Sequence, residues 1–152
     1  MGGRALLVAL AAWSADAAAL SCTVSASATH FGTYSPFDPV ALDGAGNVQV
    51  TCGNLVNILV SYTVALSTGS SGSHAARRMS NGPHLLTYNL YTNAGRSTVW
   101  GDGSGGSSVV AESYLLLLLS DQRSYPVYAR IPAGQNVAPG SYADTIVITV
   151  NY

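Results

Sequence analysis

The chain has 152 residues, of which 48% are apolar and only 9% carry a charge, and its formal net charge is -1. The charged fraction is far below the usual value of about a quarter, so uncharged polar residues must keep the surface soluble. A protein that binds nucleic acid normally has a basic patch, whereas this chain has no lysine. Arg77 and Arg78 are the only adjacent arginines, and we expect them in a solvated turn. The composition therefore argues against nucleic acid as a partner.

Residues 1–19 have the pattern of a cleaved secretory signal. Arg4 supplies the positive start, residues 5–13 are apolar, and the stretch ADAAA suits cleavage near Ala17 to Ala19. The apolar stretch is too short to span a bilayer, although a retained anchor stays an alternative. We expect an exported protein whose single domain covers residues 20–152.

Two cysteines, Cys22 and Cys52, follow the signal. In an exported chain an even number of cysteines favours a disulfide. Two thiols without nearby histidines make a poor metal site, because structural zinc usually takes four ligands. We expect a bridge that closes a loop of about thirty residues and stabilises the fold by about 3–4 kcal/mol.

The rest of the chain has the pattern of short strands separated by turns. Strand-forming residues alternate with small or polar ones, and turn-forming residues interrupt them about every dozen residues. Residues 42–47, which include two glycines, are expected to form a turn, and residues 101–108 a loop. No sustained helical periodicity follows the signal, so an all-β sandwich is predicted. The expected strands are 22–34, 48–52, 58–66, 84–92, 97–100, 109–119, 123–131 and 141–152.

The last expected strand has a clear two-residue period. Ile146, Ile148, Val150 and Tyr152 fall on one face of an extended segment, and the residues between them fall on the other. A strand with one apolar face needs a backbone partner and a cover for that face. The residues alone leave this partner open. Residues 58–66 are apolar on both faces, which is typical of a central strand.

The run of leucines at 115–119 allows two interpretations. It is too short to span a bilayer, so it is either a strand buried on both faces or an exposed apolar segment that adheres to a surface. In the second interpretation the adhesive residues are Tyr114, Leu115, Leu116, Leu117, Leu118 and Leu119.

No catalytic or metal-binding motif is present. The stretch GDGSGGS is similar to the Gly-Asp-Ser-Gly-Gly of serine proteases, but Gly103 separates Asp102 from Ser104. The chain lacks a Gly-x-Ser-x-Gly elbow and a His-Glu-x-x-His pair. Its three histidines lack metal-ligand spacing, and we expect His74 and His84 to be solvated. The sequence predicts neither an enzyme nor a metal or cofactor, although Ser, His and Asp side chains can still meet once the chain folds.

Several motifs together resemble the spore coat protein U family, whose domain also serves as the pilin of archaic chaperone–usher pili. They span nearly all of residues 20–152 in the family's order, with local departures at GNLVN and LLLLLSDQ. The motifs are CTVSA, FGTY, VTC, VSYTVALSTG, RRMSNG, YNLYT, VWGDG and VYARIPAGQNVAPGSYADTIVITVNY.

The resemblance implies an immunoglobulin-like sandwich that lacks its final strand. The missing strand would leave an apolar groove between the first and last strands. A periplasmic chaperone, and then another pilin subunit assembled at the outer-membrane usher, would each lend a strand to it. The chain would pass through the periplasm and end at the cell surface, without a cofactor. The implied groove residues are Val24, Ile146, Ile148, Val150 and Tyr152.

The segment before the domain bears on the position in a fibre. A donor extension needs about ten residues of strand. Cleavage near Ala19 would leave only Leu20 and Ser21 before Cys22, so we expect a terminal subunit, at the tip or as a cap. The alternative is a self-complete secreted adhesin, in which residues 114–119 or the tyrosine-rich strands contact a surface.

Overall fold

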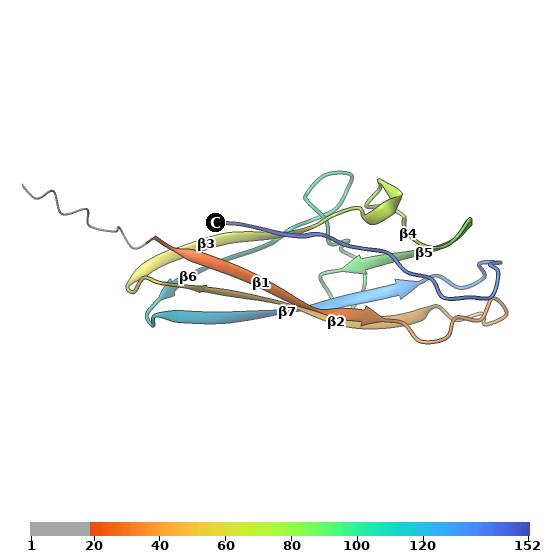
Figure 1. The fold of residues 1–152 in the computed structure, drawn as a ribbon, viewed down its shortest axis with the longest axis horizontal. Helices are drawn as coiled ribbons and strands as arrows, with labels where there is room; N and C mark the ends of the chain where they lie inside the picture. The colour runs from red at the N-terminus through yellow and green to blue at the C-terminus, as the bar shows by residue number, and fades with distance from the viewer. Residues whose placement is uncertain (1–18) are drawn as a thin grey trace, which may run out of the picture.

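The computed structural model describes residues 19–152, and the predicted signal falls almost wholly outside this range. The described residues form two antiparallel sheets and one short 3-10 helix, η1 (Gly69–Ser71) (Figure 1). The prediction of an all-β sandwich is confirmed. No helix within 19–152 has the length and apolar character needed to cross a membrane. The strands are β1 (Ser21–His30), β2 (Leu42–Gly53), β3 (Ile58–Leu66), β4 (Arg77–Asn81), β5 (His84–Tyr91), β6 (Val110–Leu116), β7 (Ser120–Ile131) and β8 (Ile148–Asn151).

One sheet has the strand order β1-β2-β7-β5-β4, and the other has the order β6-β3-β8. The central position predicted for residues 58–66 is confirmed, because β3 pairs with β6 on one side and β8 on the other. The core lies between the sheets and takes side chains from both. Its largest fully buried members are Trp100, Arg77, Leu116, Ile131, Val48, Val50, Val60, Val64 and Cys52.

The turn predicted at residues 42–47 is wrong, because these residues are the first half of β2. The two glycines have a packing role. A Cβ at Gly44 would lie 2.8 Å from the ring of Phe31, and one at Gly46 would overlap the hydroxyl of Thr29. Glycine at these two positions therefore leaves room for the side chains of Phe31 and Thr29 against β2.

The leucine run is split between a strand and a connection. β6 ends at Leu116, which is fully buried, and residues 117–119 cross to β7 in the other sheet. The interpretation as a strand buried on both faces is wrong, because Leu115 is 55% exposed and Leu117, Leu118 and Leu119 are 62–73% exposed. The residues SDQ, expected to separate two strands, instead begin β7.

A buried polar cluster corrects two further expectations. Arg77 is fully buried, and its guanidinium donates to the carbonyl oxygens of Ser67 and Trp100 and to the side chain of Asn89. His74 is also buried, with Nε2 3.1 Å from the carbonyl oxygen of Leu66. The sequence predicts both side chains in solvent, whereas the fold buries them. Carbonyl partners make their burial tolerable, and the cluster ties the loop after β3 to Trp100.

Candidate functional site

The two sheets each leave one edge open on the same side of the sandwich. Among the described residues, β1 pairs only with β2, and β8 pairs only with β3. β1 and the C-terminal segment lie side by side and run in opposite directions (Figure 1). Unpaired edges of this kind are usually covered in native proteins, because their free N–H and C=O groups can pair with another chain.

A groove of about 640 Å³ lies between these two edges. One wall is residues 26–31, from β1 and the residue after it, and the other is residues 142–144 with Ile146 and Ile148. The floor consists of side chains that belong to the core: Val48, Leu66, Met79, Tyr88, Leu90 and Val127. The groove thus opens directly onto the hydrophobic core.

A second hollow, of about 850 Å³, continues the groove towards the loops at the far end of the molecule. The two hollows share the lining residues Thr29, His30, Phe31, Met79 and Tyr142. The second is otherwise lined mainly by the segments 32–37 and 136–141. Together they form one continuous channel along the open side.

The residues predicted for this groove are distributed unevenly. Ile146 and Ile148 line it, whereas Val24, 38% exposed, lies on β1 before the lining stretch begins. Val150 is half-buried opposite Val64 of β3. Tyr152 is 59% exposed and lines a shallow depression beside Ser61. The alternating burial predicted for this segment extends over residues 142–150, although regular β8 covers only Ile148–Asn151.

Sequence reasoning missed the polar anchor of the groove wall, Asp144. Its carboxylate accepts hydrogen bonds from Tyr88 Oη at 2.7 Å and from the backbone N–H of Ser70 at 3.0 Å. Burial, together with the bond to Asp144, raises the pKa of Tyr88 far above its usual range. The one polar position within the apolar alternation of the last segment was the available signal for Asp144. The sequence contains no comparable signal for Met79 and Tyr88, because their place in the floor of the groove depends on how the sheets pack.

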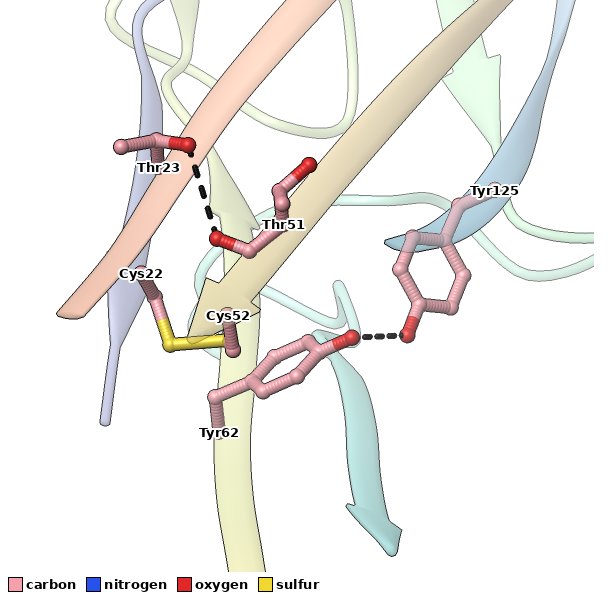
Figure 2. Close-up of a disulfide and its surroundings, with 6 residues drawn as sticks. All are labelled: Cys22, Thr23, Thr51, Cys52, Tyr62 and Tyr125. Carbon is pink, nitrogen blue, oxygen red and sulfur yellow. Dashed lines mark hydrogen bonds between the residues drawn. A yellow bond between two sulfur atoms is a disulfide. The ribbon is translucent and has the colours of Figure 1, made fainter. Parts of the chain in front are cut away.

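The predicted disulfide is confirmed. Cys22 and Cys52 are direct partners of β1 and β2, with an S–S distance of 2.08 Å (Figure 2). Beside the bridge, the hydroxyls of Tyr62 and Tyr125 lie 2.6 Å apart (Figure 2). Burial and the bond to Tyr62 raise the pKa of Tyr125 well above its usual range. The bridge therefore fastens the start of the open-edged strand to the core.

The exposed leucines gather at one end of the molecule. Leu59 and Leu115 are direct cross-strand partners. The backbone N–H of Asn54 donates to the carbonyl of Leu119, which brings the connection after β2 beside residues 117–119. Figure 1 shows both connections at the end where β1 begins. We call this set the apolar pole: Val56, Leu59, Leu115, Leu117, Leu118 and Leu119. Of the other predicted adhesion residues, Tyr114 is half-buried against Tyr62 and Leu116 is in the core.

Comparison with known proteins assigns the chain to a family. The family model for the Spore Coat Protein U domain matches residues 8–149. The chain belongs to the Spore Coat Protein U domain family. This membership confirms the resemblance read from the motifs. A curated member of similar sequence, Protein U of Myxococcus xanthus, is 33% identical over 132 residues, which is 81% of this chain and 70% of the relative.

A solved structure supports the same fold for this Spore Coat Protein U domain. It is the complex of the chaperone CsuC with the tip adhesion subunit CsuE, a pre-assembly complex of archaic chaperone–usher Csu pili from Acinetobacter baumannii. The TM-score with one of its chains is 0.58 at 23% sequence identity, and the match covers 88% of this chain. Because it covers only 40% of the other chain, the present chain corresponds to less than half of that protein.

Membership of the Spore Coat Protein U domain family also confirms that this is a structural protein and not an enzyme. Within residues 19–152, Ser104, Asp102 and His74 lie close together, but not in the order of a catalytic triad. Ser104 Oγ donates to Asp102 at 2.6 Å, and His74 Nδ1 lies 3.5 Å from the same carboxylate. His74 Nε2 bonds the carbonyl of Leu66, so the carboxylate lies between serine and histidine, where a triad needs the histidine between them.

Proposed function

We propose that the chain is an exported structural subunit of a chaperone–usher type pilus or of a surface coat, assembled by accepting a strand from another chain. The observation that carries this proposal is the groove between β1 and the last segment. Its floor is core side chains, and within residues 19–152 β1 pairs only with β2 and β8 only with β3, so neither strand has a strand partner across the groove. An added strand would satisfy both edges and cover the floor at once.

The comparisons and the disulfide support the remaining parts of the proposal. The similar structure is of a chaperone bound to a pilus subunit before assembly. By analogy, the first partner is a periplasmic chaperone, followed by an outer-membrane usher and neighbouring subunits. Disulfides persist in oxidising compartments, which agrees with passage through the periplasm and a final location on the cell surface.

Strand addition is tested by giving the domain a strand. The mature chain is produced with an alternating apolar strand fused after Tyr152 by a flexible linker, and its thermal unfolding is compared with that of the unfused chain. A strand present at a hundred times its dissociation constant adds about 2.7 kcal/mol of stability. We expect the fusion to unfold several degrees higher and to resist proteases.

The matched control carries the same strand with aspartate at every inward position. It retains the length and backbone but cannot cover the apolar floor, so it should give no gain. The proposal fails if the unfused chain is a stable monomer and the apolar strand adds nothing beyond the aspartate strand.

The position in the fibre depends on the mature N-terminus. Cleavage near Ala19 would leave only Leu20 and Ser21 before Cys22, which are too few for a donor strand, and we propose a terminal position on that basis. Mass spectrometry of the exported protein measures the cleavage site. A mature chain that starts near residue 8 would contradict the terminal position and leave strand acceptance intact.

A second candidate function, adhesion to apolar surfaces, is favoured by the apolar pole. Six large aliphatic side chains, each at least 44% exposed, lie on adjoining connections and strand ends at one end of the sandwich. Exposed apolar clusters on soluble domains commonly mark sites of interaction. This function is compatible with strand acceptance, because the groove and the pole are lined by different residues.

Adhesion is tested with the double variant Leu117→Asp, Leu118→Asp. We expect reduced retention on octyl-coated beads, with unchanged thermal unfolding because both side chains are already in solvent. Leu85→Asp is the control, since Leu85 is 48% exposed on β5 outside the pole. Equal retention of the double variant and the wild type would show that the apolar pole does not bind apolar surfaces.

A further inference from the structure

The inner face of β1 varies in size along the groove. Residues that pair directly across two antiparallel strands share a face, so Val24 and Ala26, opposite Val50 and Val48, point towards the core. After an irregularity between Ser27 and His30, Thr29 lies over Gly46 and Phe31 lies over Gly44. Among the inward side chains Val24, Ala26, Thr29 and Phe31, that of Ala26 is therefore the smallest, and Ala28, which also lines the groove, falls within the irregularity.

Ala26 and Ile148 line opposite walls of the same hollow. Ile148 pairs with Leu66 of β3 and shares its inward face. Val48, Leu66 and Val127 lie below, and all line the hollow. Protein interiors are packed to the density of organic crystals. The aliphatic side chains around this space lack partners that a neighbouring strand would ordinarily supply.

The chemistry of this space selects its occupant. Val48, Leu66, Val127 and Ile148 are aliphatic, and the carboxylate that lines the groove, Asp144, already accepts hydrogen bonds from Tyr88 and Ser70. A polar or charged side chain placed here would lose its hydration without gaining a partner. A small one would leave the space unfilled.

We propose that the groove recognises a strand of a partner protein that places a large apolar side chain opposite Ala26, and that the small size of Ala26 sets this specificity. The inference rests on the proposed function, because it concerns the same groove. It adds which side chain of the incoming strand is recognised, and which residue of this chain recognises it.

The test is a peptide titration on the mature wild-type chain. The peptides are about ten residues long, the length of a long strand. They alternate threonine and valine between terminal lysines, and in each one a different valine is replaced by phenylalanine. We expect one phenylalanine position to bind about tenfold more tightly than the all-valine peptide, because it buries the additional apolar surface.

The variant Ala26→Leu fills the space from the β1 side, so the advantage of that phenylalanine position should disappear. Its unfolding midpoint should be equal to or above that of the wild type, since leucine occupies an existing hollow. Ser25→Leu is the matched control, because Ser25 is exposed and lies on the opposite face of β1. The Ser25→Leu variant should still bind that phenylalanine peptide more tightly than the all-valine peptide. If Ala26→Leu misfolds, Ala26→Val should still reduce the advantage.

Two outcomes overturn the inference. If every phenylalanine position binds equally, or if the advantage persists in Ala26→Leu, the specificity assigned to Ala26 is wrong while strand acceptance stands. If no peptide, including the all-valine one, binds the wild-type chain, the proposed function fails and this inference fails with it.

Discussion

Arg77 shows how a single residue can organise a loop that has little secondary structure. Its guanidinium makes four hydrogen bonds, to the backbone carbonyls of Ser67 and Trp100 and to Asn89, at 2.7–3.0 Å. The planar fork of arginine suits several carbonyls at once, which the ammonium of lysine cannot match. The neighbour Arg78 is exposed, so the two adjacent arginines have opposite roles.

We predict that Arg77→Ala lowers the free energy of unfolding by at least about 3 kcal/mol, because three buried acceptors lose their donor at about 1–3 kcal/mol each. Arg78→Ala should change it by less than about 0.5 kcal/mol. Urea unfolding of both variants measures this difference. Equal effects of the two substitutions would show that the buried cluster does not stabilise the fold.

The tyrosines predict a loss of stability at alkaline pH. Burial raises the pKa of Tyr88 and Tyr125 in the folded chain, whereas in the unfolded chain both ionise near the ordinary value of about 10. The folded state favours the neutral phenol, so this stabilisation is complete below pH about 10 and declines as the pH rises further. Tyrosinate absorbance should show a late group that appears together with unfolding. A single step for all nine tyrosines while the chain stays folded would contradict this.

At the scale of the element, β1 is the least supported strand of the larger sheet. It has one backbone partner, β2, and residues 23–28 are exposed despite the inward direction of Val24 and Ala26. The Cys22–Cys52 bridge compensates at its first residues. The strand is thus fastened at one end and open along its length.

We predict that reduction of the bridge lowers the free energy of unfolding by about 3–4 kcal/mol, the chain-entropy value for a loop of about thirty residues. β1 should be the first strand to detach from its sheet when the bridge is reduced. Urea unfolding with and without reductant measures the change, and the double variant Cys22→Ser, Cys52→Ser should not respond to reductant. An unchanged midpoint for the reduced wild type would show that β1 holds by pairing alone.

Strand pattern was the most predictable level of this fold. The two-residue period of residues 141–152 and the apolar character of residues 58–66 reflect burial, which alternation records directly. Gly44 and Gly46 led to the wrong prediction of a turn, because turn propensity reflects only the local sequence. Their role is to make room for Phe31 and Thr29, which approach from the neighbouring strand. The leucine run was ambiguous for the same reason, since composition cannot say where β6 leaves one sheet for the other. The floor of the groove follows only from how the sheets stack.

For the molecule as a whole, stability should be divided between a closed side and an open side. β2, β3 and β7 each have strands on both sides, whereas β1 and β8 border the groove. We predict slow amide hydrogen exchange in the first three strands and fast exchange in β1 and β8, which slows once a donor strand is fused after Tyr152. Protection of β1 and β8 equal to that of β2 in the free chain would indicate a fold that is already complete.

The placement of the disulfide also determines how the domain would carry tension. A strand held in the groove would pull on β1, and the bridge at Cys22, the second residue of β1, would pass part of this pull to Cys52 in β2. β2 lies between β1 and β7 and is paired along its whole length with β7. The load therefore enters the sheet at an interior strand, and the backbone pairs of β1 are not peeled apart one after another. In a fibre this arrangement would hold the start of β1 in place beside the accepted strand.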